Sequence, residues 1–414
     1  MTMDSTLALD VEEIRAEFPI LSRLLHDGKP LIYLDNAATT QTPTPVLEAY
    51  SDYFNRYNAN IHRGLHSLAD EATAAFERAR DTVREFLNAE RVEEIVFTRG
   101  TTEAINLVAN TWGRANLRAG DRVVISEMEH HSNIVPWQML STELGFTLSV
   151  IPVDARGVLD LDAARSLIDE RTRLVAVNHV SNALGTINPV SELAALAHAQ
   201  GALILVDGAQ AVAHARVDVQ ALGADFYAFS GHKIYGPTGI GALYGRLELL
   251  EAMPPWQGGG EMISKVTLTE GTTFAAPPHK FEAGTPAIGE AIALDRAIRW
   301  LTNLHFELVT EWEQTLLSHT TQRLESIDGL SLIGTAPNKC GVISFVVEGA
   351  HSQDIGLLID QFGVAIRTGH HCAQPLMQKF GLDATCRASF GVYNTLEEAD
   401  QFVDALGRVI KMLR

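Results

Sequence analysis

The sequence predicts an α/β protein in which a mostly parallel sheet is covered by helices and is followed by a smaller α/β unit. From about residue 30, short apolar runs alternate with helical patterns. Several runs are continuous, which is typical of strands buried on both faces, and their spacing leaves room for crossover helices. After about residue 297 this rhythm changes, and 414 residues are enough for two domains.

A short amphipathic helix is expected near the N-terminus. The stretch from Asp10 to Glu13 has the pattern of a capping box, in which the first and fourth residues satisfy each other's backbone amides. Val11, Ile14 and Phe18 would form the apolar face of this helix.

Apolar runs predict strands in both parts of the chain. In the larger part they are Glu94–Thr98, Arg122–Ser126, Leu174–Asn178, Ala202–Asp207 and Asp225–Ser230. In the smaller part they are Val342–Val347, Val364–Arg367 and Arg387–Phe390, followed by an amphipathic helix from Asn394 to the end. We expect a large domain over residues 30–297 and a small domain formed by 1–29 with 298–414.

Composition narrows the class of protein. A net charge of −19 disfavours nucleic acid and anionic membranes as partners, because both would repel the chain. No apolar run reaches the roughly 18 residues of a membrane span, and no apolar signal core is visible at the N-terminus. The three cysteines form no C-x-x-C pair, which fits a reducing compartment. We therefore expect a cytoplasmic enzyme.

The most informative motif is the tetrapeptide that ends in Lys233. It follows an apolar strand and precedes a glycine-rich turn. A buried ammonium group is costly unless its pKa is lowered or the amine is consumed by a covalent bond. Pyridoxal phosphate consumes a lysine in this way, as a Schiff base.

Other motifs reach the same predicted sheet edge and supply what this cofactor needs. Thr101 and Thr102 follow Gly100 at a helix start that suits a phosphate, although an ordinary glycine turn with a threonine cap has the same pattern. Asp207 ends a buried strand, where it could face a pyridine nitrogen or simply cap the next helix. Four further residues could hydrogen-bond the ring hydroxyl, hold the phosphate or stack on the ring: Gln210, Ser230, His232 and His130.

Cys372 is the candidate nucleophile. It lies in R-T-G-H-H-C-A-Q-P, and a cysteine on a glycine-flanked loop among basic side chains can be partly thiolate. Alternatively, a cysteine can serve as a small apolar residue buried in the core, and we expect this of Cys340 and Cys386. A zinc site of Cys372 with the two preceding histidines is disfavoured, because adjacent side chains on an extended loop point apart. No metal is expected.

Nearly the whole chain resembles the group II (Suf-type) cysteine desulfurases, including those with selenocysteine lyase activity, within the class V pyridoxal phosphate enzymes. The resemblance rests on long motifs in the family's order. They are Y-L-D-N-A-A-T-T, N-I-H-R-G, R-G-T-T-E-A-I-N-L, M-E-H-H-S-N-I-V-P-W, H-V-S-N-A-L-G-T, V-D-G-A-Q, D-F-Y-A-F-S-G-H-K-I-Y-G-P-T-G-I-G, F-E-A-G-T-P and R-T-G-H-H-C-A-Q-P.

The resemblance implies a fold-type-I homodimer whose large domain holds a seven-stranded sheet. It makes Lys233 the Schiff-base lysine and places Asp207 at the ring nitrogen, Gln210 at the ring oxygen and His130 over the ring. It assigns the phosphate to Thr101, Thr102, Ser230 and His232, with Thr285 reaching in from the other protomer.

The resemblance also implies the reaction. L-cysteine would become L-alanine, with Lys233 as general base and a persulfide left on Cys372. Arg387 would bind the substrate carboxylate with help from Asn182, and Arg367 and His62 match other active-site positions. A Suf-E-like or Suf-U-like acceptor protein would carry the sulfur to iron–sulfur cluster assembly.

Two features fit group II rather than group I: the short spacing from Cys372 to Arg387 and an expected hairpin insertion at Pro254–Ile263. A selenocysteine lyase or a cysteine sulfinate desulfinase remains an alternative, since selenium or sulfinate can leave without attack by the thiol. Different classes are an aminotransferase, a kynureninase-like hydrolase or an inactive binding scaffold.

Overall fold

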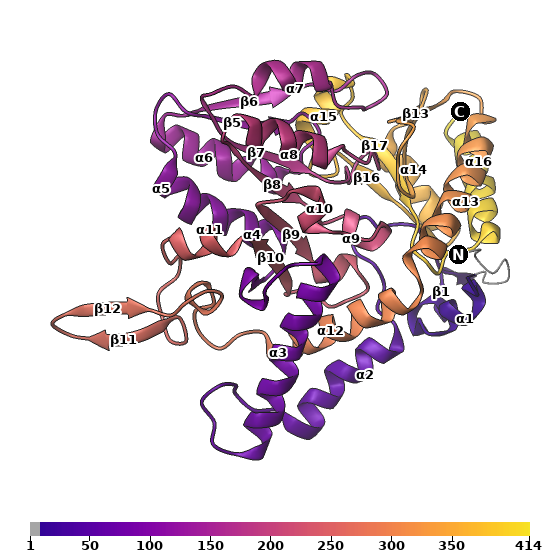
Figure 1. The fold of residues 1–414 in the computed structure, drawn as a ribbon. Coiled ribbons are helices and arrows are strands. Elements are labelled where there is room, and N and C mark those ends of the chain that lie inside the picture. The colour runs from indigo at the N-terminus through magenta and orange to yellow at the C-terminus, as the bar shows by residue number, and fades with distance from the viewer. Residues whose placement is uncertain (1–8) are drawn as a thin grey trace, which may run out of the picture.

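The computed structural model describes residues 9–414, and a seven-stranded sheet forms its centre (Figure 1). The strand order is β4-β10-β9-β8-β7-β5-β6, and only β10 runs antiparallel to its neighbours. The strands are β4 (Ile95–Thr98), β5 (Arg122–Ser126), β6 (Thr147–Ile151), β7 (Thr172–Asn178), β8 (Leu203–Asp207), β9 (Phe226–Ser230) and β10 (Gly241–Gly245).

Burial explains why the strand sequences are continuous apolar runs. Along β9, Tyr227 and Phe229 pack into one hydrophobic core, whereas Phe226 and Ala228 pack into a second core on the opposite face. Helices α3 and α8 contribute to the first core, and α4 and α6 to the second. Both faces of the sheet are therefore buried at this central strand, as in other parallel sheets covered by crossover helices.

The helices that cover and flank this sheet alternate with its strands. They are α2 (Thr44–Asp52), α3 (Ser67–Leu87), α4 (Thr101–Val108), α5 (Arg114–Asn116), α6 (Val135–Leu144), α7 (Leu161–Leu167), α8 (Val190–Ala199), α9 (Ala211–His214), α10 (Val219–Leu222), α11 (Leu247–Ala252) and α12 (Ile288–Asn303). No helix within residues 9–414 is long and apolar enough to cross a membrane.

All five predicted strands of this sheet are confirmed, with ends that differ by at most two residues. Two further strands had not been predicted. β6 is an edge strand with mixed burial, so its sequence lacks a continuous apolar run. β10 begins and ends with glycine, a residue that strands usually avoid. Gly241 is needed there, because a Cβ would lie 2.6 Å from the Cα of Gly100.

A second, four-stranded antiparallel sheet lies in the C-terminal part, in the order β13-β14-β17-β16. Its strands are β13 (Leu330–Ile333), β14 (Val342–Val347), β16 (Arg367–Gly369) and β17 (Thr385–Ser389), and the helices are α13 (Phe306–Glu325), α14 (Ser352–Asp360), α15 (Gln374–Lys379) and α16 (Leu396–Leu413). The last helix begins two residues later than predicted, because the Thr395 side chain caps the amide of Glu398.

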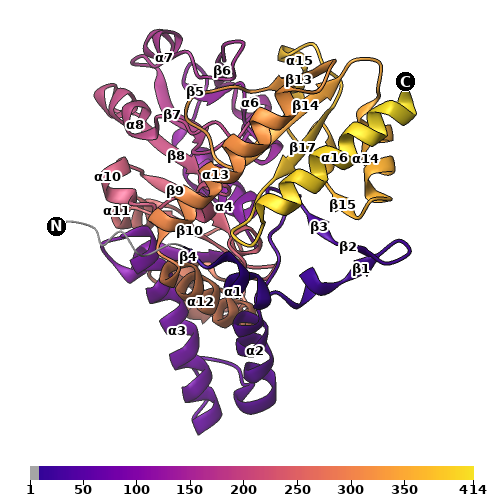
Figure 2. The ribbon, with the colours of Figure 1, turned by 90° about the vertical axis from the view of Figure 1, so that its right-hand side faces the viewer.

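One predicted strand of this region is split. Instead of a single strand over 364–367, β15 (Val364–Ala365) pairs in parallel with β3 (Ile32–Tyr33), while Arg367 begins β16. The N-terminal segment thus lies against the C-terminal sheet, as Figure 2 shows. This segment contains α1 (Val11–Ala16), where Asp10 accepts a hydrogen bond from the Glu13 amide, and the small strands β1 (Leu24–Leu25) and β2 (Lys29–Pro30).

The expected insertion is displaced. The hairpin consists of β11 (Ile263–Thr267) and β12 (Gly271–Phe274), so residues 254–262 form the loop that leads into it. The hairpin projects from the body of the molecule (Figure 1). Val266 and Leu268 on it are exposed.

A buried ion pair fixes the segment that leads to Thr285. Arg80 on α3 is 1% exposed and donates to both carboxylate oxygens of Glu282, at 2.7 and 2.9 Å. Removing one partner leaves the other charge buried and unpaired, which costs about 3–5 kcal/mol. We expect Arg80→Met to lower the free energy of unfolding by that amount in a denaturant titration. Arg156→Met, which breaks an exposed ion pair with Asp154, is the control.

Candidate active site

A cavity of about 230 Å³ lies at the carboxyl ends of the central parallel strands. Asn178, Asp207 and Ser230, the last residues of β7, β8 and β9, all line it. This edge is where open α/β sheets bind ligands. The C-terminal sheet contributes Arg367 and Arg387 from the opposite side.

Twelve of the predicted site residues line this cavity. They are Thr101, Thr102, His130, Asn182, Asp207, Gln210, Ser230, His232, Lys233, Arg367, Cys372 and Arg387. Thr285 and His62 lie elsewhere in this single chain. Thr285 lines a separate hollow beside Arg99, and the His62 ring is 2.8 Å from a Glu77 oxygen.

One end of the cavity is rich in hydrogen-bond donors. The Thr101 amide, at the start of α4, donates to the Ser230 hydroxyl at 2.9 Å, and the Thr101 hydroxyl is also 2.9 Å from it. The buried Nδ1 of His232 has no hydrogen-bond partner. A helix start with two hydroxyls and an unsatisfied ring nitrogen suits a phosphate group.

Asp207 is buried and Lys233 is half-buried at the cavity, and the loss of solvation shifts each toward its neutral form. Burial raises the pKa of the Asp207 carboxyl, although an amide hydrogen bond from Ala209 and the charge of Lys233 oppose this. Burial lowers the pKa of Lys233 to about 8, with Asp207 opposing and Arg387 assisting. The Lys233 amine is therefore available as a nucleophile or base near neutral pH.

His130 is held as a neutral imidazole. Its Nδ1 lies 2.7 Å from the Ser132 hydroxyl, and burial together with Lys233 lowers the pKa of the ring to about 4. The preceding residue, Glu129, was not predicted to contribute. Its buried carboxyl accepts bonds from Asn133 at 2.8 Å and from the Asn178 amide at 3.0 Å, and burial raises its pKa to about 8.

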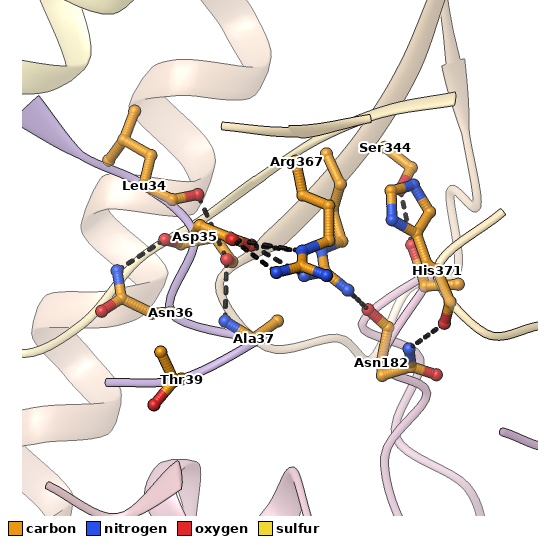
Figure 3. Close-up of polar contacts among 12 residues, drawn as sticks. Leu34, Asp35, Asn36, Ala37, Thr39, Asn182, Ser344, Arg367 and His371 are labelled. Carbon is orange, nitrogen blue, oxygen red and sulfur yellow. Dashed lines mark hydrogen bonds and ion pairs between the residues drawn. The ribbon is translucent and has the colours of Figure 1, made fainter. Parts of the chain in front are cut away.

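Two arginines form the opposite wall. The Arg387 side chain is only 2% exposed, and it donates to the Asn182 carbonyl at 2.9 Å. Arg367 is half exposed, and both guanidinium groups contact Asp35, which Figure 3 shows beside Arg367. Asp35 is not among the predicted site residues, although it lies within the motif Y-L-D-N-A-A-T-T. The local sequence does not indicate that it contacts two arginines.

Cys372 is exposed and lies on a tight turn at the cavity rim. His371 and Cys372 have φ values of 52° and 53°, so the loop is not extended as expected. The conformation is left-handed at both positions, which non-glycine residues rarely adopt. Within residues 9–414 no cluster of three or more metal-ligating side chains occurs. The other two cysteines are buried, in agreement with the role predicted for them.

His131 braces the Cys372 loop. Its backbone amide donates to the Cys372 carbonyl at 2.7 Å, and its Nε2 accepts from the Gln374 amide at 3.1 Å. Asn182 adds a third attachment by donating to the His371 carbonyl at 2.7 Å. The loop is thus fixed to the edge of the large sheet on both sides of the thiol.

We expect His131→Phe to loosen this loop, because the Gln374 amide loses its acceptor. A single hydrogen bond is worth about 0.5–1.5 kcal/mol, so amide hydrogen exchange at Gln374 should accelerate about 2- to 12-fold. His351→Phe is the matched control, because His351 also accepts a backbone amide bond, from Gln353, but on α14. Unchanged exchange in His131→Phe would contradict the bracing role.

The fold and this cavity define a class of enzymes. Residues 32–402 match the family model described as aminotransferase class-V, and the chain belongs to that family. A cysteine desulfurase of Klebsiella pneumoniae (strain 342) is 53% identical over 407 residues, covering 98% of this chain and all of the relative. One of Escherichia coli (strain SE11) is 51% identical over the same length.

Solved structures agree with this assignment. The cysteine desulfurase CsdA from Escherichia coli has a TM-score of 0.91 and 39% identity, covering 99% of this chain and all of that chain. The cysteine desulfurase from Thermococcus onnurineus NA1 has a TM-score of 0.92 and 41% identity, with the same coverage. Family and fold class are therefore confirmed, and the four similar proteins named above are cysteine desulfurases.

Proposed function

We propose that this protein is a pyridoxal phosphate-dependent cysteine desulfurase, which converts L-cysteine to L-alanine and leaves a persulfide on Cys372. The observation that carries the proposal is that the exposed thiol of Cys372 and the half-buried amine of Lys233, whose pKa is lowered, line the same cavity. The full-length similarity to cysteine desulfurases supports the same reaction. Neither an aminotransferase nor a kynureninase-like hydrolase needs a thiol at this position.

The lining residues fit pyridoxal phosphate. Asp207 is a buried carboxyl without a cationic hydrogen-bond partner in the cavity, as a pyridinium nitrogen requires, and the free Nδ1 of His232 fits a phosphate oxygen. The residues that would hold the phosphate are Thr101, Thr102, Ser230 and His232; those around the ring are His130, Asp207, Gln210 and Lys233. When bound, the cofactor withdraws electrons from the substrate Cα and makes its proton acidic.

The chain's own residues account for the other steps. Arg387 binds the substrate carboxylate through paired charged hydrogen bonds. Lys233, with a pKa lowered to about 8, takes the Cα proton. The Cys372 thiolate attacks the substrate sulfur, so an S–S bond forms while the Cβ–S bond breaks. The bonding electrons stay with the carbon fragment, which gains protons and leaves as alanine.

Several finer predictions remain proposals. We infer a homodimer in which Thr285 of the second copy reaches the phosphate, and His62 belongs to the substrate-binding set. We also propose a large domain over 30–297, a small domain of 1–29 with 298–414, of which residues 1–8 lie outside the described part, and a cytoplasmic location. The sulfur acceptor is a Suf-E-like or Suf-U-like protein that serves iron–sulfur cluster assembly.

The direct test is to incubate the holoenzyme with L-cysteine, quantify alanine and sulfide, and map added mass on Cys372. Equimolar alanine and sulfide with a reductant-sensitive gain of one sulfur on Cys372 would support the proposal. Alanine from L-selenocysteine or cysteine sulfinate alone would identify a lyase or desulfinase instead. Keto acid or anthranilate as the product would point to another class V reaction.

A further inference from the structure

Asp35 occupies an unusual place between the two arginines of the cavity wall. Its Oδ1 accepts from Arg387 Nη2 at 3.0 Å, and its two oxygens lie 3.2 and 3.1 Å from Arg367 Nε. Arg367 Nη2 adds a contact of 3.1 Å to Oδ2. The carboxylate is mostly shielded, with a side chain that is 16% exposed. One acid therefore joins both guanidinium groups.

The strand register explains why an acid is needed there. Arg367 on β16 and Arg387 on β17 are directly opposite each other in an antiparallel pair. Like charges at directly opposite positions destabilise a sheet, and here one of them is buried. Burial and the charge of Arg367 both lower the pKa of Arg387, and Asp35 opposes them.

The backbone fixes Asp35 at this position. Asp35 forms a parallel bridge with Ser389, and the neighbouring Leu34 donates to the Ala365 carbonyl at 2.9 Å and accepts from the Ser389 amide at 2.7 Å. The Ala37 amide donates to the Ser389 hydroxyl at 2.9 Å. The N-terminal segment is thus held against β15 and the end of β17, and Figure 3 shows Asp35 beside Arg367.

We propose that Asp35 is the positioning residue of the substrate-carboxylate site: it holds Arg367 and Arg387 side by side and leaves the trio with one net positive charge. This inference rests on the proposed function, which has Arg387 bind the substrate carboxylate. Without Asp35, the half-exposed Arg367 turns to solvent, and Arg387 loses the carboxylate that it contacts at 3.0 Å. The carboxylate then meets one guanidinium group instead of an ordered pair.

The test uses Asp35→Asn in the holoenzyme, with Asp169→Asn as control. Asp169 also lies between two arginines, 2.9 Å from both Arg122 and Arg171, but outside the cavity. The readouts are kcat and KM for L-cysteine and, separately, a spectrophotometric titration with L-alanine, which carries the carboxylate but no sulfur.

We expect Asp35→Asn to raise KM for L-cysteine and the Kd for L-alanine about tenfold or more, because a charge-assisted hydrogen bond typically contributes that much to affinity. The kcat should stay within about threefold of the wild-type value. Asp169→Asn should leave all three unchanged. In an Arg367→Gln background, Asp35→Asn should have a much smaller effect, because the residues act as a unit. Asp35→Glu keeps the charge and should fall between the wild type and Asp35→Asn.

The inference is overturned if Asp35→Asn binds L-alanine as tightly as the wild type, or more tightly. It is also overturned if the effects of Asp35→Asn and Arg367→Gln on L-alanine binding are additive, or if Asp35→Glu binds L-alanine more weakly than Asp35→Asn. If Asp35→Asn does not fold, Asp35→Glu must still bind L-alanine within about threefold of the wild type. A wild type that does not turn over L-cysteine would refute the proposed function, whereas the alanine titration would still test Asp35.

Discussion

Cys372→Ser is expected to abolish sulfur transfer from L-cysteine while leaving the cofactor site intact. A serine hydroxyl at this rim is not ionised near neutral pH, so nothing attacks the substrate sulfur. Loss of a covalent nucleophile typically reduces turnover about 1000-fold or more. Alanine formation should fall by that factor, and mass spectrometry should find no persulfide. The cofactor's absorbance should be unchanged, because Cys372 lies at the rim and not among the phosphate-binding groups.

Cys340→Ala provides the control. Cys340 is also a free cysteine, but it is 1% exposed, packs in a small core with Ala211 and Val342, and does not itself line the cavity. Its substitution should preserve the rate of alanine formation. Full activity of Cys372→Ser on L-cysteine would refute the assigned nucleophile. Activity retained only on L-selenocysteine would show that selenium leaves without the thiol.

Lys233→Ala is expected to remove both the covalent attachment of the cofactor and the general base. Borohydride reduction of the wild-type holoenzyme should add the mass of the reduced cofactor to the peptide that contains Lys233. The variant should show no such addition, and alanine formation should fall about 1000-fold or more. In the cofactor-free wild type, the rate of attachment should rise with pH through about 8 and level off above it, because the reactive neutral amine becomes the dominant form above its pKa.

Lys339→Ala is the matched control for this experiment. Burial also lowers the pKa of Lys339 to about 8, but its ammonium donates to the Gly334 carbonyl at 2.7 Å and does not line the cavity. A lysine with a similar pKa in the wrong place should carry no cofactor. If Lys339 were labelled instead of Lys233, the site assignment would be wrong.

The sequence was sufficient to predict five strands of the central sheet, because both faces of these strands are buried and the strands are therefore continuous apolar runs. The placement of Lys233 and Asp207 at one sheet edge followed from strands β8 and β9 being neighbours. β10 was not predicted, because glycine is required at position 241 by the close approach of the Gly100 backbone, and the local sequence does not indicate such a contact.

The role of Asp35 could not be read from the sequence for a different reason. Its partner Arg387 is 352 positions away, and their contact depends on how the N-terminal segment joins the C-terminal strands. The contact of His131 with the Cys372 loop could likewise not be predicted, because its partner Gln374 is 243 positions away. Thr285 and His62 stay predictions, since one chain alone cannot bring a second copy to the site.

The ion pair between Asp35 and Arg387 also concerns the timing of synthesis. Asp35 is synthesised early, whereas Arg387 is synthesised 352 residues later. The cavity wall that the two residues form with Arg367 can therefore assemble only late in translation. A nascent chain that ends before Arg367 already carries Lys233, Asp207 and the two threonines proposed to bind the phosphate, but no thiol at residue 372 and no ordered carboxylate site. We infer that a nascent chain that ends before Arg387 cannot complete the carboxylate site, so turnover of L-cysteine begins only after β17 has been made and has paired.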